Sequence, residues 1–212
     1  MANVLIATIP VVYDERAHQR VLARLKYWPQ SGTTDLASAV GYLMVEYLLN
    51  SQCVSASVFH SLHQNEYGKW MLSNSPIDFN ISHSGNKVVA VITDNGKAGI
   101  DIEQLRPISW QDYKDVFSSE EWLLLNNAHH PESLFFDLWT KKESLSKAYG
   151  LGMQLEFSTV RINEDKGCVL PTSMEGYFYP IMVPQYTAHV CLTHRQGVFV
   201  KKFDFQALSG TI

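Results

Sequence analysis

The alternation of apolar and polar residues along the chain predicts where its strands and helices lie. Residues 4–12 are almost continuously apolar and predict a buried strand. Residues 33–50 repeat apolar positions at helical spacing, and Thr33 or Thr34 is the predicted N-cap of that helix. The first part of the chain therefore predicts a strand followed by a long helix.

The middle of the chain carries a second set of signals. Residues 78–82 and 88–93 predict a β-hairpin around a Ser-Gly-Asn turn. Residues 99–103, GIDIE, alternate so that two isoleucines share one face of a strand and two acids share the other. Residues 117–125 predict a helix with a capping box, and residues 131–149 predict the clearest helix of the chain, ended by glycines.

The tail alternates short strands with turns, in segments 157–162, 176–183, 187–193 and 197–203. Each half of the chain thus has the order strand, helix, strands. This order predicts an α+β fold built from two similar subdomains, residues 1–97 and residues 98–212.

Composition and charge narrow the class of protein. A net charge of −4 over 212 residues argues against a nucleic-acid-binding protein with a wholly basic surface. The three scattered cysteines, without a Cys-x-x-Cys pair, indicate reduced thiols, and no run of about 20 apolar residues predicts a membrane span. No stretch resembles a signal peptide. We therefore expect a cytoplasmic protein with no nucleic-acid or membrane partner.

Two segments together suggest a metal site, although each alone has an ordinary explanation. Asp101 and Glu103 share a strand face, and Glu143 and Lys147 are spaced as a helical ion pair. Three carboxylates supply the oxygen ligands that magnesium prefers. Lys147 and its neighbour Lys142 are then candidate counter-charges for substrate phosphates, a combination suited to phosphoryl chemistry.

Two further segments offer groups that bind anions. Ser82 and His83 enter a glycine-containing turn, and Lys69 lies in another. Either segment alone is more typical of an ordinary turn than of a binding site.

Five motifs, in order and spacing, resemble those of the 4′-phosphopantetheinyl transferases of the two-subdomain class. They are YGK, FNISHS, GIDIE, FSSEEW and WTKKESLSKAYG, and they fall within residues 66–160. The resemblance implies transfer of the phosphopantetheine arm of coenzyme A to a serine of an acyl, peptidyl or polyketide carrier protein, with release of adenosine 3′,5′-bisphosphate. It also implies a pseudo-dimer of subdomains with coenzyme A in the cleft between them. Fatty-acid, polyketide and non-ribosomal peptide synthesis all stay open as pathways.

The resemblance implies a role for each acid. Asp101 and Glu143 would bind magnesium, and Glu103 would bind it directly or through water; manganese is the alternative metal. A serine hydroxyl is a poor nucleophile at neutral pH, so a base is expected. Glu143 is the preferred base and Glu121 its rival, although Glu121 is also the expected capping-box partner of Ser118.

The resemblance also implies phosphate contacts. Lys147, counted with the catalytic residues, and Lys142 would contact phosphates of coenzyme A. Ser82, His83 and Lys69 would hold the phosphate groups of the nucleotide.

One departure from the family concerns the residues that bind the 3′-phosphate of coenzyme A. Family members carry basic residues in and before the first long helix, but residues 33–50 contain neither lysine nor arginine. Residues 1–97 hold seven basic and seven acidic side chains, so this half of the chain has no excess of positive charge for binding phosphate. Arg24 and Lys26 are the remaining candidates for the 3′-phosphate.

The main alternative to a working transferase is a binding module that holds carrier protein or coenzyme A without turnover. An unrelated magnesium-dependent hydrolase is a more distant alternative. A cleft within one chain needs no second copy, so a monomer is expected.

Overall fold

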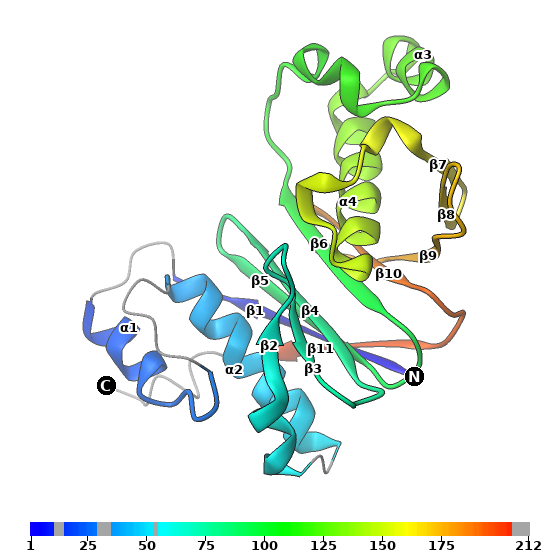
Figure 1. Ribbon diagram of the computed structural model, residues 1–212. Helices are drawn as coiled ribbons and strands as arrows, with labels where there is room; N and C mark the ends of the chain where they lie inside the picture. The colour runs from blue at the N-terminus through cyan, green and yellow to red at the C-terminus, as the bar shows by residue number, and fades with distance from the viewer. Residues whose placement is uncertain (11–14, 29–34, 53–54, 205–212) are drawn as a thin grey trace.

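The computed structural model describes residues 1–10, 15–28, 35–52 and 55–204, and the two ends of the chain are marked in Figure 1. The α-helices are α1 (Glu15–Leu22), α2 (Leu36–Ser51), α3 (Ser119–Asn127) and α4 (Pro131–Tyr149). Short 3₁₀ helices cover Ala56–Ser61, Trp110–Val116, Gly152–Gln154 and Phe157–Thr159. The strands are β1 (Ala2–Thr8), β2 (Leu62–Gln64), β3 (Trp70–Leu72), β4 (Asp78–Ser84), β5 (Lys87–Thr93), β6 (Ala98–Gln104), β7 (Val160–Asn163), β8 (Lys166–Val169), β9 (Glu175–Pro180), β10 (Tyr186–Leu192) and β11 (Val198–Phe203).

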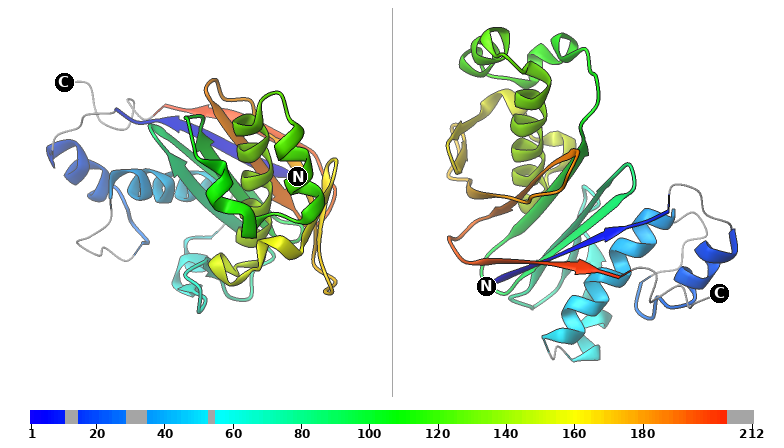
Figure 2. Two further views of the ribbon diagram at one scale, coloured as in Figure 1. Left: turned by 90° about the horizontal axis from the view of Figure 1, so that it is seen from above. Right: turned by 180° about the vertical axis from the view of Figure 1, so that it is seen from behind.

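The strands form two main sheets and a short hairpin of β2 and β3. One sheet has the order β11-β1-β5-β4, and the other has the order β6-β10-β9-β8-β7. The predicted hairpin is confirmed as β4 and β5, and the mixed α+β class is confirmed. The last strand, β11, pairs in parallel with β1, so the two lie side by side in Figure 2. The division of the chain at residue 97 stays a prediction.

The ends of the elements follow local chemistry, with two corrections. The first strand covers Ala2–Thr8 rather than 4–12, of which residues 11 and 12 lie outside the described residues. Thr33 and Thr34 also lie outside them, and the N-cap of α2 is Asp35, whose carboxylate accepts the backbone N–H of Ser38.

Helix α3 begins, and helix α4 ends, with the chemistry that the sequence predicts. The capping box of Ser118 and Glu121 starts α3, and Gly150, in the left-handed conformation, ends α4. Helix α1 was not predicted. Within the described residues, none of the helices combines the length and apolar character that a membrane crossing requires.

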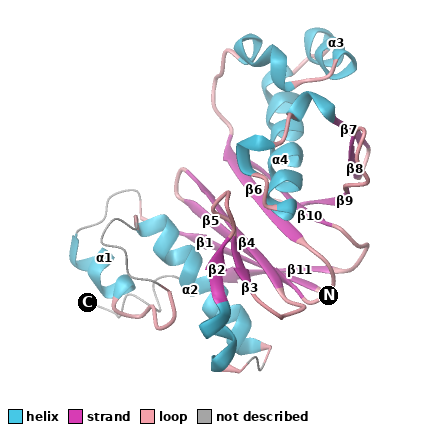
Figure 3. Cartoon of the chain, in the orientation of Figure 1, coloured by secondary structure: helices cyan, strands magenta, loops and turns pink. Residues whose placement is uncertain are grey.

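Each main sheet has one face covered by a helix, as Figure 3 shows for α2 and α4. Leu5, Ala90 and Ile92 face α2 in one core, whereas Leu145 of α4 packs with Phe178 and Cys191 in another. The faces turned away from the helices share a third core, which contains Val4, Val89, Val91, Ile100, Ile102 and Val190. This arrangement fixes α4 against the acidic face of β6, because the isoleucines of β6 take the opposite face.

Helix α4 lies close against the backbone of β6 at Gly99. A Cβ atom at this position would overlap the backbone carbonyl oxygen of Ser144 and the backbone nitrogen of Ala148. The glycine of GIDIE is therefore needed for close packing of α4 on the strand that carries Asp101.

Alanine at Gly99 is expected to lower the free energy of unfolding by about 1–3 kcal/mol, because backbone rather than a flexible side chain must move. Gly197→Ala is the matched control, since the nearest atom to its added methyl group would be 3.6 Å away. Urea denaturation of both variants checks the prediction. Equal stability of the two variants would contradict it.

Candidate active site

Strand β4 joins β6 through side chains rather than through a main-chain ladder. Alternate residues of β4 are polar, namely Asp78, Asn80, Ser82 and Ser84, and the apolar residues between them, Phe79 and Ile81, pack in the α2 core. Asp78, Asn80 and Ser84 accept hydrogen bonds from the amides of Ala98, Ile100 and Gln104 at 2.8, 3.1 and 3.1 Å. We call this row of contacts the β4–β6 seam.

The two acids of β6 lie along this seam. Asp101 is 3% exposed, and its Oδ1 accepts hydrogen bonds from the hydroxyl of Ser82 at 2.9 Å and from Lys147 Nζ at 2.5 Å. Glu103 is half-buried and accepts the hydroxyl of Ser84 at 3.0 Å. The second oxygen of Asp101, Oδ2, is buried and has no hydrogen-bond partner among the described residues.

Helix α4 brings Glu143 and Lys147 to the same place. Burial raises the pKa of Glu143, with the charges of Asp101 and Glu103 acting in the same direction and Lys147 acting against them. Burial also raises the pKa of Glu103, and the charge of Asp101 adds to this effect. Burial disfavours the charged form of Lys147, but attraction to the three acids outweighs it and raises the pKa of the ammonium ion. Three acids therefore share one lysine.

The excess negative charge, and the oxygen of Asp101 that has no partner in the described part of the chain, fit a divalent cation. Oxygen ligands of this kind are those that magnesium prefers. The acids are not yet arranged around a common point, since no three His, Cys, Asp or Glu side chains in the described part of the chain form a group that could hold a metal ion. Some of the carboxylate oxygens instead accept hydrogen bonds from Lys147, which bonds to Asp101, and from Ser84, which bonds to Glu103.

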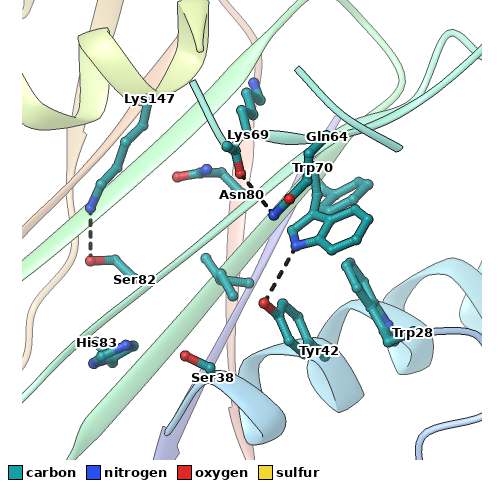
Figure 4. Close-up of a pocket in the computed structure, with 13 residues that line it drawn as sticks. Trp28, Ser38, Tyr42, Gln64, Lys69, Trp70, Asn80, Ser82, His83 and Lys147 are labelled. Atoms are coloured by element: carbon teal, nitrogen blue, oxygen red, sulfur yellow. Dashed lines mark hydrogen bonds between the residues drawn. The ribbon is translucent and has the colours of Figure 1, made fainter. Parts of the chain in front are cut away.

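A cavity of about 350 Å³, whose lining residues are drawn in Figure 4, is connected to Asp101. Lys147 connects the two, because its ammonium ion bonds to Asp101 and, at 3.1 Å, to the hydroxyl of Ser82, which lines the cavity. The other polar lining residues are Ser38, Gln64, Lys69, Asn80 and His83. The predicted residues Ser82, His83, Lys69 and Lys147 thus line one cavity.

Aromatic side chains form the wall of the cavity away from the acids. Trp28 stacks on Tyr42 with ring centroids 4.3 Å apart and meets Trp70 edge-on at 5.2 Å. The indole N–H of Trp70 points to the hydroxyl of Tyr42 at 3.4 Å, whereas Trp28 Nε1 is buried without a partner among the described residues. The sequence analysis missed this wall, because the three residues are far apart in the chain and only the fold brings them together.

Lys69 lines the cavity, but its ammonium ion is already engaged. Its side chain is 7% exposed, and Nζ donates to Asp78 at 2.7 Å and to the carbonyls of Ala98 and Ala148 at 3.1 and 2.9 Å. Burial lowers the pKa of Lys69, and Asp78 opposes this shift. An ammonium ion has three N–H donors, so these contacts use all of them.

Lys142 lies outside the cavity lining, with a wholly buried side chain. Its Nζ donates to Glu121 at 2.8 Å and to the carbonyl of Phe157 at 2.7 Å. Glu121 also accepts the backbone N–H of Ser118 in the capping box. The geometry places this pair in the packing of α3 against α4, which favours a structural role for both residues.

The remaining candidates are solvent-exposed. Arg24 and Lys26 do not line the cavity, and the backbone N–H of Lys26 bonds to the carboxylate of Glu46. His83 lines the cavity from the end of β4 and is exposed. The structure therefore brings neither Arg24 nor Lys26 to the cavity.

His189 is a buried group that the sequence analysis did not single out. It is 4% exposed and paired in register with Asp101, and its Nδ1 lies 2.8 Å from the hydroxyl of Thr140 on α4. Burial lowers the pKa of His189 from 6.5 to about 4, with Asp137 opposing the shift.

Acidification is expected to destabilise the fold through His189. A histidine whose pKa is lower in the folded state contributes stability that is complete above its unfolded pKa of 6.5 and is lost as the pH falls towards 4. Between pH 7 and pH 5 the loss is about 2 kcal/mol. Urea denaturation at both pH values measures it, and His189→Asn should remove most of the difference. An unchanged pH dependence in that variant would contradict the assignment.

Comparison with known proteins gives a consistent set of relatives. Residues 97–191 match the 4′-phosphopantetheinyl transferase superfamily. The chain is 36% identical over 138 residues to 4′-phosphopantetheinyl transferase Sfp of Bacillus subtilis (strain 168), covering 61% of each chain. It is 39% identical over 153 residues to a 4′-phosphopantetheinyl transferase of Bacillus subtilis, covering 66% of this chain and 67% of that protein. It is 41% identical over 113 residues to 4′-phosphopantetheinyl transferase psf-1 of Bacillus pumilus, covering 51% and 47%. The matches thus span from about half to two thirds of these relatives.

Proposed function

The chain belongs to the 4′-phosphopantetheinyl transferase superfamily, and from this premise we propose that it transfers the phosphopantetheine arm of coenzyme A to a serine of an acyl, peptidyl or polyketide carrier protein. The serine oxygen bonds to the phosphorus next to pantetheine, and the bond from that phosphorus to the bridging oxygen breaks. Adenosine 3′,5′-bisphosphate leaves. The observation that carries the proposal is Lys147, whose ammonium ion joins the cavity to Asp101, Glu103 and Glu143, which we call the acidic cluster.

The cavity is suited to the nucleotide end of coenzyme A. Aromatic faces stack on nucleobases, and Trp28, Tyr42 and Trp70 supply the aromatic rings that line this cavity. His83 and Lys147, which line the cavity, supply donors for phosphate oxygens, since Lys147 has a third N–H beyond its bonds to Asp101 and Ser82. The hydroxyl of Ser82 donates to Asp101 and holds Lys147 in place. Lys69, with its donors engaged, contributes to the wall.

The acids are suited to hold magnesium, or manganese as the alternative, with Asp101, Glu103 and Glu143 as ligands. When bound, the cation would neutralise charge on the pyrophosphate and on the departing bisphosphate. Asp101 Oδ2, which has no hydrogen-bond partner among the residues that the structure describes, supports this assignment. Lys147 adds a fixed positive charge at the same place.

Glu143 is the proposed base for the serine hydroxyl. A base is most effective when its pKa lies near the working pH, and burial raises the pKa of Glu143 in that direction. Glu121 is already engaged by Ser118 and Lys142, which favours a structural role for it.

The predicted pseudo-dimer, with its active site between the subdomains, is part of the same proposal. Two sheets that each carry one helix on a face, joined along the β4–β6 seam, support it. Ser82 and Trp28 come from the first half and Lys147 from the second, and all three line the cavity. A monomer acting in the cytoplasm completes the proposal.

The test is incubation of the protein with coenzyme A, magnesium and an apo carrier protein, followed by mass spectrometry of the carrier. A mass gain of one phosphopantetheine group, together with release of the bisphosphate, is expected. A non-catalytic binding module would instead bind coenzyme A in calorimetry and leave every carrier unmodified, which would overturn the proposal. An acyl carrier and a peptidyl carrier tested side by side would indicate the pathway.

A further inference from the structure

The loop between β2 and β3 contacts both elements that carry the acidic cluster, namely β6 and α4. Its Lys69 donates to the carbonyl of Ala98, the first residue of β6, and to the carbonyl of Ala148, in the last turn of α4. Residue 148 directly follows Lys147. One buried ammonium ion therefore contacts the start of the strand that bears Asp101 and the end of the helix that bears Glu143.

Asp78 completes this contact from β4. Its Oδ2 accepts Lys69 Nζ at 2.7 Å and the backbone N–H of Ala98 at 2.8 Å. Both main-chain polar groups of Ala98 are thus bonded within the same ion pair. A carbonyl near the C-terminus of a helix is a favourable partner for a cation, which accounts for the contact with Ala148.

Asn65 adds a second contact from the same loop. Its Nδ2 donates to the carbonyl of Gly150 at 2.7 Å, and its Oδ1 accepts the backbone N–H of Lys69 at 2.8 Å. Gly150 leaves room for this approach, since a Cβ atom there would lie 2.7 Å from Asn65 Nδ2. The loop thus holds the end of α4 at two carbonyls.

We propose that Lys69 is a positioning residue, which with Asp78 ties β6 to the end of α4 and so sets Asp101 opposite Lys147 and Glu143. Its importance for transfer rests on the proposed function. The competing explanation is the phosphate contact that the sequence predicts for Lys69, because the side chain lines the cavity. Three engaged donors and 7% exposure favour positioning.

The two explanations predict opposite kinetics. Lys69→Met should lower kcat by about tenfold or more and leave the KM and the calorimetric Kd for coenzyme A within about twofold, because no ligand contact is lost. Asp78→Asn added to Lys69→Met removes the uncompensated buried charge, so it should restore stability while kcat stays low, because the bonds to the carbonyls of Ala98 and Ala148 remain lost. A phosphate contact would instead weaken coenzyme A binding about tenfold or more in both variants, and that result would overturn the proposal.

A readout independent of turnover is hydrogen–deuterium exchange of residues 143–151. Lys69→Met should speed exchange in this segment, and the double variant should keep the faster exchange, because it also lacks the bond to Ala148. Lys87→Met is the matched control, since Lys87 bonds to Thr8 at the surface and should change neither exchange nor kinetics. Unchanged exchange in Lys69→Met would overturn the proposal even for a protein without transferase activity, whereas absence of transfer by the unaltered protein would overturn only the proposed function.

If Lys69→Met does not fold, Asn65→Ala tests the same proposal. It removes the bond to Gly150 and leaves the ion pair in place, so a smaller change in the same direction is expected in kcat and in exchange. Unchanged kcat and exchange in Asn65→Ala would then overturn the proposal.

Discussion

Asparagine in place of Asp101 is expected to lower kcat/KM for transfer by at least about 100-fold while the protein stays folded. The amide keeps the shape of the carboxylate and can still accept the hydroxyl of Ser82. It loses the charge that holds Lys147 and the oxygen, Oδ2, that is buried without a partner among the described residues. Transfer kinetics with an apo carrier protein and magnesium titrations by calorimetry measure the two losses.

The control for this substitution is Asp165→Asn. Asp165 forms an exposed ion pair with Arg195 and lies outside the proposed site. An exposed pair contributes little to stability, so this variant should keep full activity. Retention of more than about a tenth of the activity by Asp101→Asn would refute the proposed role of Asp101.

Methionine in place of Lys142 is expected to destabilise the protein by about 3–5 kcal/mol, because it leaves Glu121 as a buried charge without its partner. The carbonyl of Phe157 also loses its donor, and a second oxygen of Glu121, Oε1, already has no partner among the described residues. Urea denaturation measures the loss. The KM for coenzyme A should stay unchanged under conditions where the variant is folded, because Lys142 does not line the cavity.

Two further variants make the Lys142 result specific. Lys141→Met removes the neighbouring lysine, which pairs with Asp137 one turn away, and should cost only about 0.5 kcal/mol. Glu121→Gln added to Lys142→Met should restore part of the stability, since glutamine keeps an acceptor for Ser118 without a charge. A stable Lys142→Met variant with a raised KM for coenzyme A would instead support the phosphate contact that the sequence suggests.

The features that the sequence predicts well are those set by neighbouring residues. The capping box of Ser118 and Glu121 and the glycine that ends α4 each depend on a few consecutive positions, and both are present. The alternation of GIDIE likewise places Asp101 and Glu103 together, beside Ser82 and Ser84. In these cases local chemistry and the final fold agree.

The features that the sequence does not predict depend on distant partners. Lys69 and Lys142 look like phosphate ligands in a motif, but their donors are taken by Asp78, Glu121 and backbone carbonyls that only the fold brings near. The aromatic wall of Trp28, Tyr42 and Trp70 and the buried His189 arise in the same way. A side chain's type is visible in the sequence, whereas the number of its free donors is not.

The pairing of β11 with β1 has a consequence for how the chain acquires its structure. Strand β1 lies between β5 and β11, and Ala2 is in register with Val198. Closing contacts of such long sequence separation is slow, because the entropy of the intervening loop must be lost first. During synthesis one edge of β1 therefore stays unpaired until residues 198–203 have emerged, and such an unpaired edge is open to mispairing.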